Sequence, residues 1–135
     1  MERKNLNRGF KKPNVWNDAV KLYCLVYQIM SKMPYELKKV ASNAIDAAQS
    51  ISRNIAEGYC RRSIKEYVQF LYFALGSSGE LHSCIYSFFK SNQISEINFN
   101  RLDDLHYKTE NELIQLVKSL QKKIKDNNWN DNLNF

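Results

Sequence analysis

The stretch S-I-S-R-N-I-A-E-G-Y occupies residues 50–59, and the stretch F-L-Y-F-A-L-G-S-S-G-E-L occupies residues 70–81. Both place alanine, serine and glycine among large apolar residues at helical spacing. Because small residues on a helix face let two backbones approach closely, the two stretches predict tightly packed helices. The residues assigned to this packing, within one chain or between copies of it, are Ala48, Asn54, Glu57, Gly58, Gly76, Ser77 and Glu80.

Apolar periodicity extends N-terminally from these stretches and predicts two helices there. The first covers residues 14–33 and ends at Pro34, which cannot continue a helix. The second covers residues 35–57. Gly58 is the expected stop of this helix, because glycine adopts the left-handed conformation at little cost.

Two further helices are predicted C-terminally. Ser63 followed by Glu66 is a capping box, so the third helix is expected to begin there and to end near Asn92. After a short polar loop, an apolar stripe over residues 102–124 marks the fourth helix.

Four amphipathic helices with short connections predict an all-α, antiparallel up-down four-helix bundle over residues 14–125. A basic N-terminal arm, residues 1–13, precedes it, and a polar C-terminal tail, residues 126–135, follows it. The third helix also has large apolar residues outside its main stripe. Since each helix of a small bundle should keep one face in water, these residues indicate self-association. They are Tyr67, Phe70, Tyr72, Phe73, Tyr86 and Phe89.

The net charge of +6 is concentrated at the N-terminus. Residues 1–13 hold five basic residues against one acid, which gives this arm a charge of +4. A basic arm on a nearly neutral body indicates a polyanionic partner, whereas a solvated terminus that aids solubility is the alternative. The basic residues of the arm are Arg3, Lys4, Arg8, Lys11 and Lys12.

A second basic cluster is expected at the corner between the second and third helices. Several lysine and arginine side chains there could contact phosphates. The alternative is a solvated corner in which the basic residues pair with Glu57 and Glu66. The basic residues of this corner are Arg53, Arg61, Arg62 and Lys65.

Motifs for catalysis and for metal or cofactor binding do not occur in the sequence. The two histidines, His82 and His106, lie in no zinc or di-iron spacing. The sequence also lacks a phosphate-binding glycine loop and a nucleophile elbow. We therefore expect no enzymatic activity, no cofactor and no metal site.

Two polar residues of the second helix are expected to have structural roles. Glu57 precedes Arg61 by four residues, an order that favours an ion pair on a continuous helix, and Arg62 is a second candidate partner. No other acid or base is placed to make Glu57 catalytic. Asn54 is expected to form a hydrogen bond to a neighbouring helix.

The cysteines and the hydropathy favour a cytoplasmic protein that does not enter a membrane. Cys24, Cys60 and Cys84 have no paired spacing, so reduced thiols are expected. The chain has no run of about 18 apolar residues, and its N-terminus lacks the apolar core of a signal peptide.

Four motifs follow one another along the first three predicted helices. They are V-W-N-D-A at residues 15–19, M-P-Y-E at residues 33–36, S-I-S-R-N-I-A-E-G at residues 50–58, and the segment 70–81 quoted above. With its motifs in this order, the chain resembles the four-helix bundle family named after the 23S-rRNA intervening-sequence protein. The resemblance covers residues 10–95, and the fourth predicted helix is compatible with it. N-I-A-E-G followed by A-x-G-S-x-x-E-L is the most specific part of the resemblance.

The resemblance implies a small helical subunit that assembles as a ring-shaped homopentamer and is not an enzyme. It also implies an RNA-binding role or, as in the related accessory variability determinant of diversity-generating retroelements, binding to a reverse transcriptase and nucleic acid. We therefore expect a homo-oligomer that binds RNA or DNA through basic surface without base specificity. A reverse-transcriptase accessory subunit and a purely structural scaffold are the alternatives.

One departure from the family pattern concerns residues 43–47. The family usually has Q-I-R-R-A there, whereas this chain has N-A-I-D-A, which places Ile45 and Asp46 where two arginines usually stand. If the arginine pair joins a buried network with the acid of N-I-A-E-G, then Glu57 needs another partner here. If the pair contacts nucleic acid, that contact is weaker in this chain.

Overall fold

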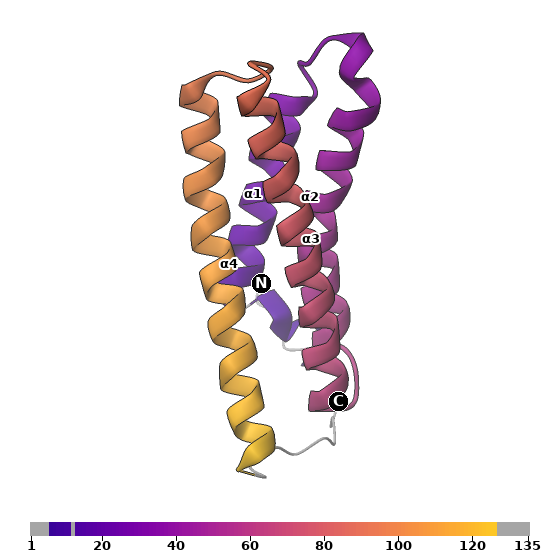
Figure 1. The fold of residues 1–135 in the computed structure, drawn as a ribbon. Coiled ribbons are helices and arrows are strands. Elements are labelled where there is room, and N and C mark those ends of the chain that lie inside the picture. Colours follow the sequence, from indigo (N-terminus) through magenta and orange to yellow (C-terminus); the bar gives the residue numbers. More distant parts are fainter. Residues whose placement is uncertain (1–5, 12, 127–135) are drawn as a thin grey trace, which may run out of the picture.

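The computed structural model describes residues 6–11 and 13–126, which form four α-helices packed as a bundle (Figure 1). Successive α-helices run in opposite directions, so the all-α up-down bundle predicted from the sequence is confirmed. Short 3₁₀ helices precede α1 and α2. In chain order the elements are η1 (Leu6–Lys11), α1 (Asn14–Met30), η2 (Tyr35–Leu37), α2 (Lys38–Tyr59), α3 (Ile64–Lys90) and α4 (Glu96–Lys125).

The predicted ends of α3 are confirmed by its caps. Ser63 Oγ accepts a hydrogen bond from the backbone N–H of Glu66 at 3.1 Å, as in a capping box. At the other end Asn92 has a φ of 60°, and the backbone N–H of Gln93 bonds to the carbonyl oxygen of Phe88 at 2.8 Å. This left-handed ending satisfies the last carbonyl groups of the helix and turns the chain toward α4.

The ends of two other helices differ from the sequence prediction. α1 ends at Met30, a few residues before the expected stop. α4 begins at Glu96, well before Leu102 opens its apolar stripe. The early start is possible because Ser95 Oγ accepts a hydrogen bond from the backbone N–H of Asn98 at 3.1 Å, which caps a polar first turn.

Gly58 does not end α2 in the way that the sequence predicted. The helix continues to Tyr59, and none of the glycines in the described chain has a positive φ. A Cβ atom at Gly58 would lie only 2.7 Å from Cβ of Phe70 and 3.1 Å from the carbonyl oxygen of Tyr67. Gly58 is therefore required by the close approach of α3 and not by a left-handed turn.

Alanines supply much of the α2 side of the core. Ala44 and Ala48 are fully buried, and Ala41 and Ala47 are nearly so. Small side chains allow neighbouring helices to lie close together, and α2 and α3 share the most extensive contact of any helix pair described. This agrees with the close helix packing that the opening stretches predicted.

The up-down order determines which segments lie together at each end of the bundle. The α1–α2 and α3–α4 connections lie at the upper end in Figure 1, whereas the α2–α3 corner and the end of α4 lie at the lower end. Near the lower end Gln121 Nε2 donates a hydrogen bond to Tyr72 Oη, which sets the register of α4 beside α3.

Candidate nucleic-acid interface

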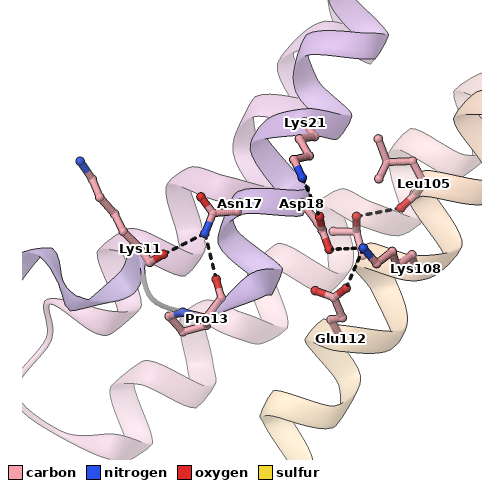
Figure 2. Close-up of polar contacts among 9 residues, drawn as sticks. Lys11, Pro13, Asn17, Asp18, Lys21, Leu105, Lys108 and Glu112 are labelled. Atoms are coloured by element: carbon pink, nitrogen blue, oxygen red, sulfur yellow. Dashed lines mark hydrogen bonds and ion pairs between the residues drawn. The ribbon is translucent and has the colours of Figure 1, made fainter.

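The basic arm is anchored to the bundle where it joins α1. Phe10 packs edge-on against Trp16 and against Tyr59, with ring centroids 5.1 Å and 6.4 Å away. Asn17 Nδ2 donates a hydrogen bond to the carbonyl oxygen of Lys11 at 2.8 Å (Figure 2). The junction between the arm and the bundle is therefore folded, and the backbone of Lys11 is held there while its side chain is exposed.

The other predicted contact residues of the arm cannot be placed in the same way. Arg3, Lys4 and Lys12 lie outside the described residues, and so does the side chain of Arg8. The proposed role of these residues stays a prediction.

The α2–α3 corner presents basic side chains, as the sequence predicted. Arg61 Nη2 lies 2.9 Å from Glu57 Oε1, and the guanidinium carbon of Arg61 lies 4.7 Å from the centre of the Phe70 ring. The predicted Glu57–Arg61 ion pair is therefore confirmed. Arg62 and Lys65 are exposed beside it.

Arg53 belongs to a different contact from the rest of the corner. It lies about two turns earlier on α2, and its Nη2 is 3.7 Å from Asp46 Oδ1. Asp46 and Ile45 replace the arginine pair of the family pattern, and Ile45 is half-buried against the core. The acid at this position thus has a partner on its own helix, while Glu57 has Arg61.

The C-terminal end of α4 is a further basic segment, and the up-down order of the helices places it near the α2–α3 corner. The last turn of α4 is rich in lysine and lies at the same end as the corner (Figure 1). Since Gln121 bonds to Tyr72, the antiparallel register places Lys125 within about 5 Å of Lys65 along the bundle axis. We call the exposed residues of this end the basic pole: Lys11, Arg61, Arg62, Lys65, Lys122, Lys123 and Lys125.

The polar contact between α2 and α3 differs from the expected one. Asn54 Nδ2 donates hydrogen bonds to the carbonyl oxygen and to Oγ of Ser50, at 2.8 Å and 3.0 Å, within α2 itself. The prediction that Asn54 bonds directly across helices is therefore wrong. The hydrogen bond between the helices joins Ser50 Oγ and Ser77 Oγ, which are 2.8 Å apart.

Gly76 does not bring two helices of one chain together, so the prediction of a packing notch within the bundle is wrong. Gly76 and Gly79 are exposed, and a Cβ atom added to either would find no atom within 4 Å. Glu80, one residue later, is also exposed. On the same side of α3 lie three large aromatic residues that are each about half exposed. They are Tyr72, Phe73 and Tyr86.

A comparison with known families agrees with this bundle. The model of the 23S rRNA-intervening sequence protein family matches residues 11–125. The chain belongs to this family. No curated protein matches the chain.

The family consists of small helical proteins with no known catalytic activity. In this member, the described residues contain no group of three or more histidine, cysteine, aspartate or glutamate side chains that could hold a metal ion. None of the helices in the same part of the chain is long and apolar enough to cross a membrane.

This member of the intervening-sequence family has a buried polar cluster between α3 and α4. Ser78 Oγ donates a hydrogen bond to Glu110 Oε2 at 3.0 Å and lies 3.0 Å from His106 Nε2. His106 Nε2 is also 2.8 Å from the carbonyl oxygen of Ser78, so this nitrogen carries a hydrogen. The His106 ring lies 5.2 Å from that of His82, which pairs with Asp103. Ser78 and His106 are buried, so the cluster satisfies polar groups inside the bundle.

A second polar cluster joins α1 and α4 and was not anticipated from the sequence (Figure 2). Asp18 is only 4% exposed, and its Oδ2 lies 3.1 Å from Lys108 Nζ. Lys21 Nζ lies 3.9 Å from Asp18 Oδ1, and Lys108 Nζ lies 3.9 Å from Glu112 Oε1. Burial acts to raise the pKa of Asp18, but the neighbouring side chains of Glu112 and Lys108 lower it below its ordinary value of 3.8.

The sequence does contain a signal for this cluster. Asp18 follows Val15 by three residues and precedes Leu22 by four, so it falls on the buried stripe of α1. An acid at such a position requires a partner from another helix. The identity of that partner, Lys108 together with Glu112, does not follow from local spacing.

Proposed function

We propose that this member of the 23S rRNA-intervening sequence protein family is a homo-oligomer that binds RNA or DNA through the basic pole, without base specificity and without enzymatic chemistry. The main support is the convergence of the arm junction, the α2–α3 corner and the end of α4 at one end of the bundle. Contacts between basic side chains and phosphates release counterions, which gives affinity that depends on salt and little on sequence.

The proposal is tested by removing charge from the basic pole. Arg62, Lys65 and Lys122 are exposed, so replacing all three with serine should leave the fold intact. Binding to a labelled RNA hairpin and to single-stranded DNA of several sequences is measured over a salt series. If the three residues contact phosphates, the slope of log affinity against log salt decreases by about 2–3.

The opposite end of the bundle supplies a matched control. Lys32, Lys38 and Lys39 are exposed there, and their replacement with serine removes the same charge. This control should lose much less affinity than the basic-pole variant. Equal losses in both variants would contradict binding at the basic pole, and a wild-type affinity that does not change with salt would contradict the electrostatic mechanism.

The arm is tested by charge replacement and not by deletion, because Phe10 packs against Trp16 and Tyr59. Replacing Arg3, Lys4, Arg8 and Lys12 with serine should weaken nucleic-acid binding beyond the loss in the basic-pole variant, while Phe10 stays in place. Unchanged affinity would show that the arm has no part in binding.

Self-association is supported by the outer side of α3. Exposed aromatic residues flank Gly76 and Gly79, where the helix backbone is open to close approach by another chain. Gly76→Leu should keep the unfolding midpoint of the subunit and reduce the mass seen by light scattering after nuclease treatment. Gln28→Leu, at an exposed site on α1, is the control. An unchanged mass of the Gly76 variant, or a monomeric wild type at micromolar concentration, would contradict this part of the proposal.

A further inference from the structure

Asp18 and Glu112 lie on the two sides of the α1–α4 contact and share one ammonium group: Lys108 Nζ lies 3.1 Å from Asp18 Oδ2 and 3.9 Å from Glu112 Oε1 (Figure 2). Apart from the ion pair with Lys108, the buried atoms Asp18 Oδ2 and Glu112 Oε2 have no nitrogen or hydroxyl donor among the described residues. An ionised carboxylate only accepts hydrogen bonds. Two ionised carboxylates would leave these buried oxygens without a hydrogen-bond donor of their own, whereas a proton on one carboxyl group supplies a donor.

The surrounding charges indicate which carboxyl group holds the proton. Asp18 lies 3.1 Å from the Lys108 ammonium and 3.9 Å from that of Lys21, whereas Glu112 lies 3.9 Å from Lys108. The closer ammonium groups favour the ionised form of Asp18. Burial, followed by the neighbouring Asp18 side chain and its negative charge, raises the pKa of Glu112 to about 7.

We propose that Glu112 holds a proton that it donates in a hydrogen bond to Asp18. This proton stabilises the contact between α1 and α4, and the contact therefore depends on pH. Loss of the proton leaves two carboxylates facing each other, with Lys108 between them. A groove of about 520 Å³ between the start of α1 and α4, lined in part by Glu112, Asn14 and Gln115, lets water reach the new charge. The α1–α4 contact therefore weakens as the pH rises.

The direction of the effect follows from proton binding. Folded Glu112 keeps its proton up to a pKa of about 7, whereas an unperturbed glutamate loses it near 4.5. Between these values the folded chain binds more protons than the unfolded chain, so the free energy of unfolding falls as the pH rises. In this window the folding equilibrium constant falls by up to about tenfold per pH unit, and above it the loss is complete.

The α3–α4 contact holds further ionisable side chains. His82 lies against Asp103, and His106 lies against Ser78 and Glu110. The contribution of Glu112 has to be isolated by a variant that leaves this second cluster intact.

Glu112→Gln is that variant, because its amide group donates a hydrogen bond to Asp18 at every pH. Urea unfolding of the full chain is measured between pH 5 and pH 8.5. We expect the folding equilibrium constant of Glu112→Gln, relative to wild type, to rise at least tenfold from pH 5 to pH 8. Glu96→Gln, at an exposed site on the same helix, should keep the wild-type pH profile.

A second measurement follows the proton itself. The carboxyl ¹³C shift of Glu112 should titrate near pH 7 in the wild type and at lower pH in Asp18→Asn, which lacks the negative partner. A midpoint near 4.5 in the wild type, or parallel stability profiles of wild type and Glu112→Gln, would overturn the proposal. Neither result depends on nucleic-acid binding, so the two proposals fail independently.

Discussion

The α2–α3 contact and the α1–α4 contact are built from different chemistry. Between α2 and α3, Gly58 leaves room for the backbone of the neighbouring helix, and a serine pair provides a short hydrogen bond. Between α1 and α4, Asp18, Lys108 and Glu112 meet beside an open groove. The first contact leaves no room for a larger side chain at position 58, whereas the second is built from charged side chains.

This difference means that the two contacts should respond to different perturbations. Added side-chain volume should disrupt α2–α3, because a close-packed core has no space for it. Changes of charge or pH should act on α1–α4, because a buried acid is stable only with its partner. Variants that add volume and variants that remove charge test whether the two contacts respond differently.

The largest effect is expected for Ala48→Leu. Ala48 is fully buried on α2, and the larger side chain should overpack the core by about 3 kcal/mol. Urea unfolding measures the loss. Ser42→Leu, at an exposed site on the same helix, should change the free energy of unfolding by no more than about 0.5 kcal/mol. Equal stability of the two variants would show that α2 has more space around it than its burial indicates.

Two glycine substitutions should have effects of opposite sign. Gly58→Ala should destabilise the subunit by about 1–2 kcal/mol, since its Cβ atom would lie 2.7 Å from Cβ of Phe70. Gly76→Ala should stabilise the isolated subunit by about 0.5–1 kcal/mol, because its Cβ atom meets nothing and alanine favours the helix. Thermal unfolding at low protein concentration compares them. The same sign for both would contradict the assignment of Gly58 to the helix contact.

Removal of the ammonium partner should make the α1–α4 contact sensitive to acid. Lys108 helps to lower the pKa of Asp18, so the ionised carboxylate contributes stability above its ordinary value of 3.8 and loses it as the pH falls through the lowered pKa. In Lys108→Met this stabilisation is smaller, and acid unfolding should begin at a higher pH. Circular dichroism between pH 2 and pH 7 measures the shift. Lys118→Met, at an exposed site on the same helix, should leave the acid transition where it is.

The smallest effect is expected for the exposed pair on α2. Arg53 and Asp46 are 3.7 Å apart, and both side chains are mostly exposed. Arg53→Ala should therefore change the free energy of unfolding by no more than about 0.5 kcal/mol. A larger loss, measured by urea unfolding, would indicate that Arg53 has a packing role like that of the α2–α3 contact.

The helices and their buried faces could be predicted because the relevant information is local. Val15, Leu22 and Val26 recur at helical spacing and are all buried. Ser63 caps α3 through a neighbour only three residues away. The basic α2–α3 corner could also be predicted, since Arg61, Arg62 and Lys65 are close in the sequence.

The environment of each glycine and the composition of the candidate sites were decided by the tertiary structure. Gly58 and Gly76 lie in similar sequence patterns, yet one is pressed against α3 and the other is open. The lysines of α4 join the basic pole only because α4 returns beside α3. Asp18 likewise reaches Lys108, the lysine that also pairs with Glu112, only across a helix contact.

By itself, the sequence determined the number of helices, the ends of α3 and the apolar faces of the helices, because these depend on backbone energies and side-chain period over a few residues. The tertiary structure alone decided which small residues are crowded, which charges share an end of the bundle and which acids lie beside Lys108. Those outcomes depend on the rotation and register of each helix against its neighbours, and the packing of the whole core sets both.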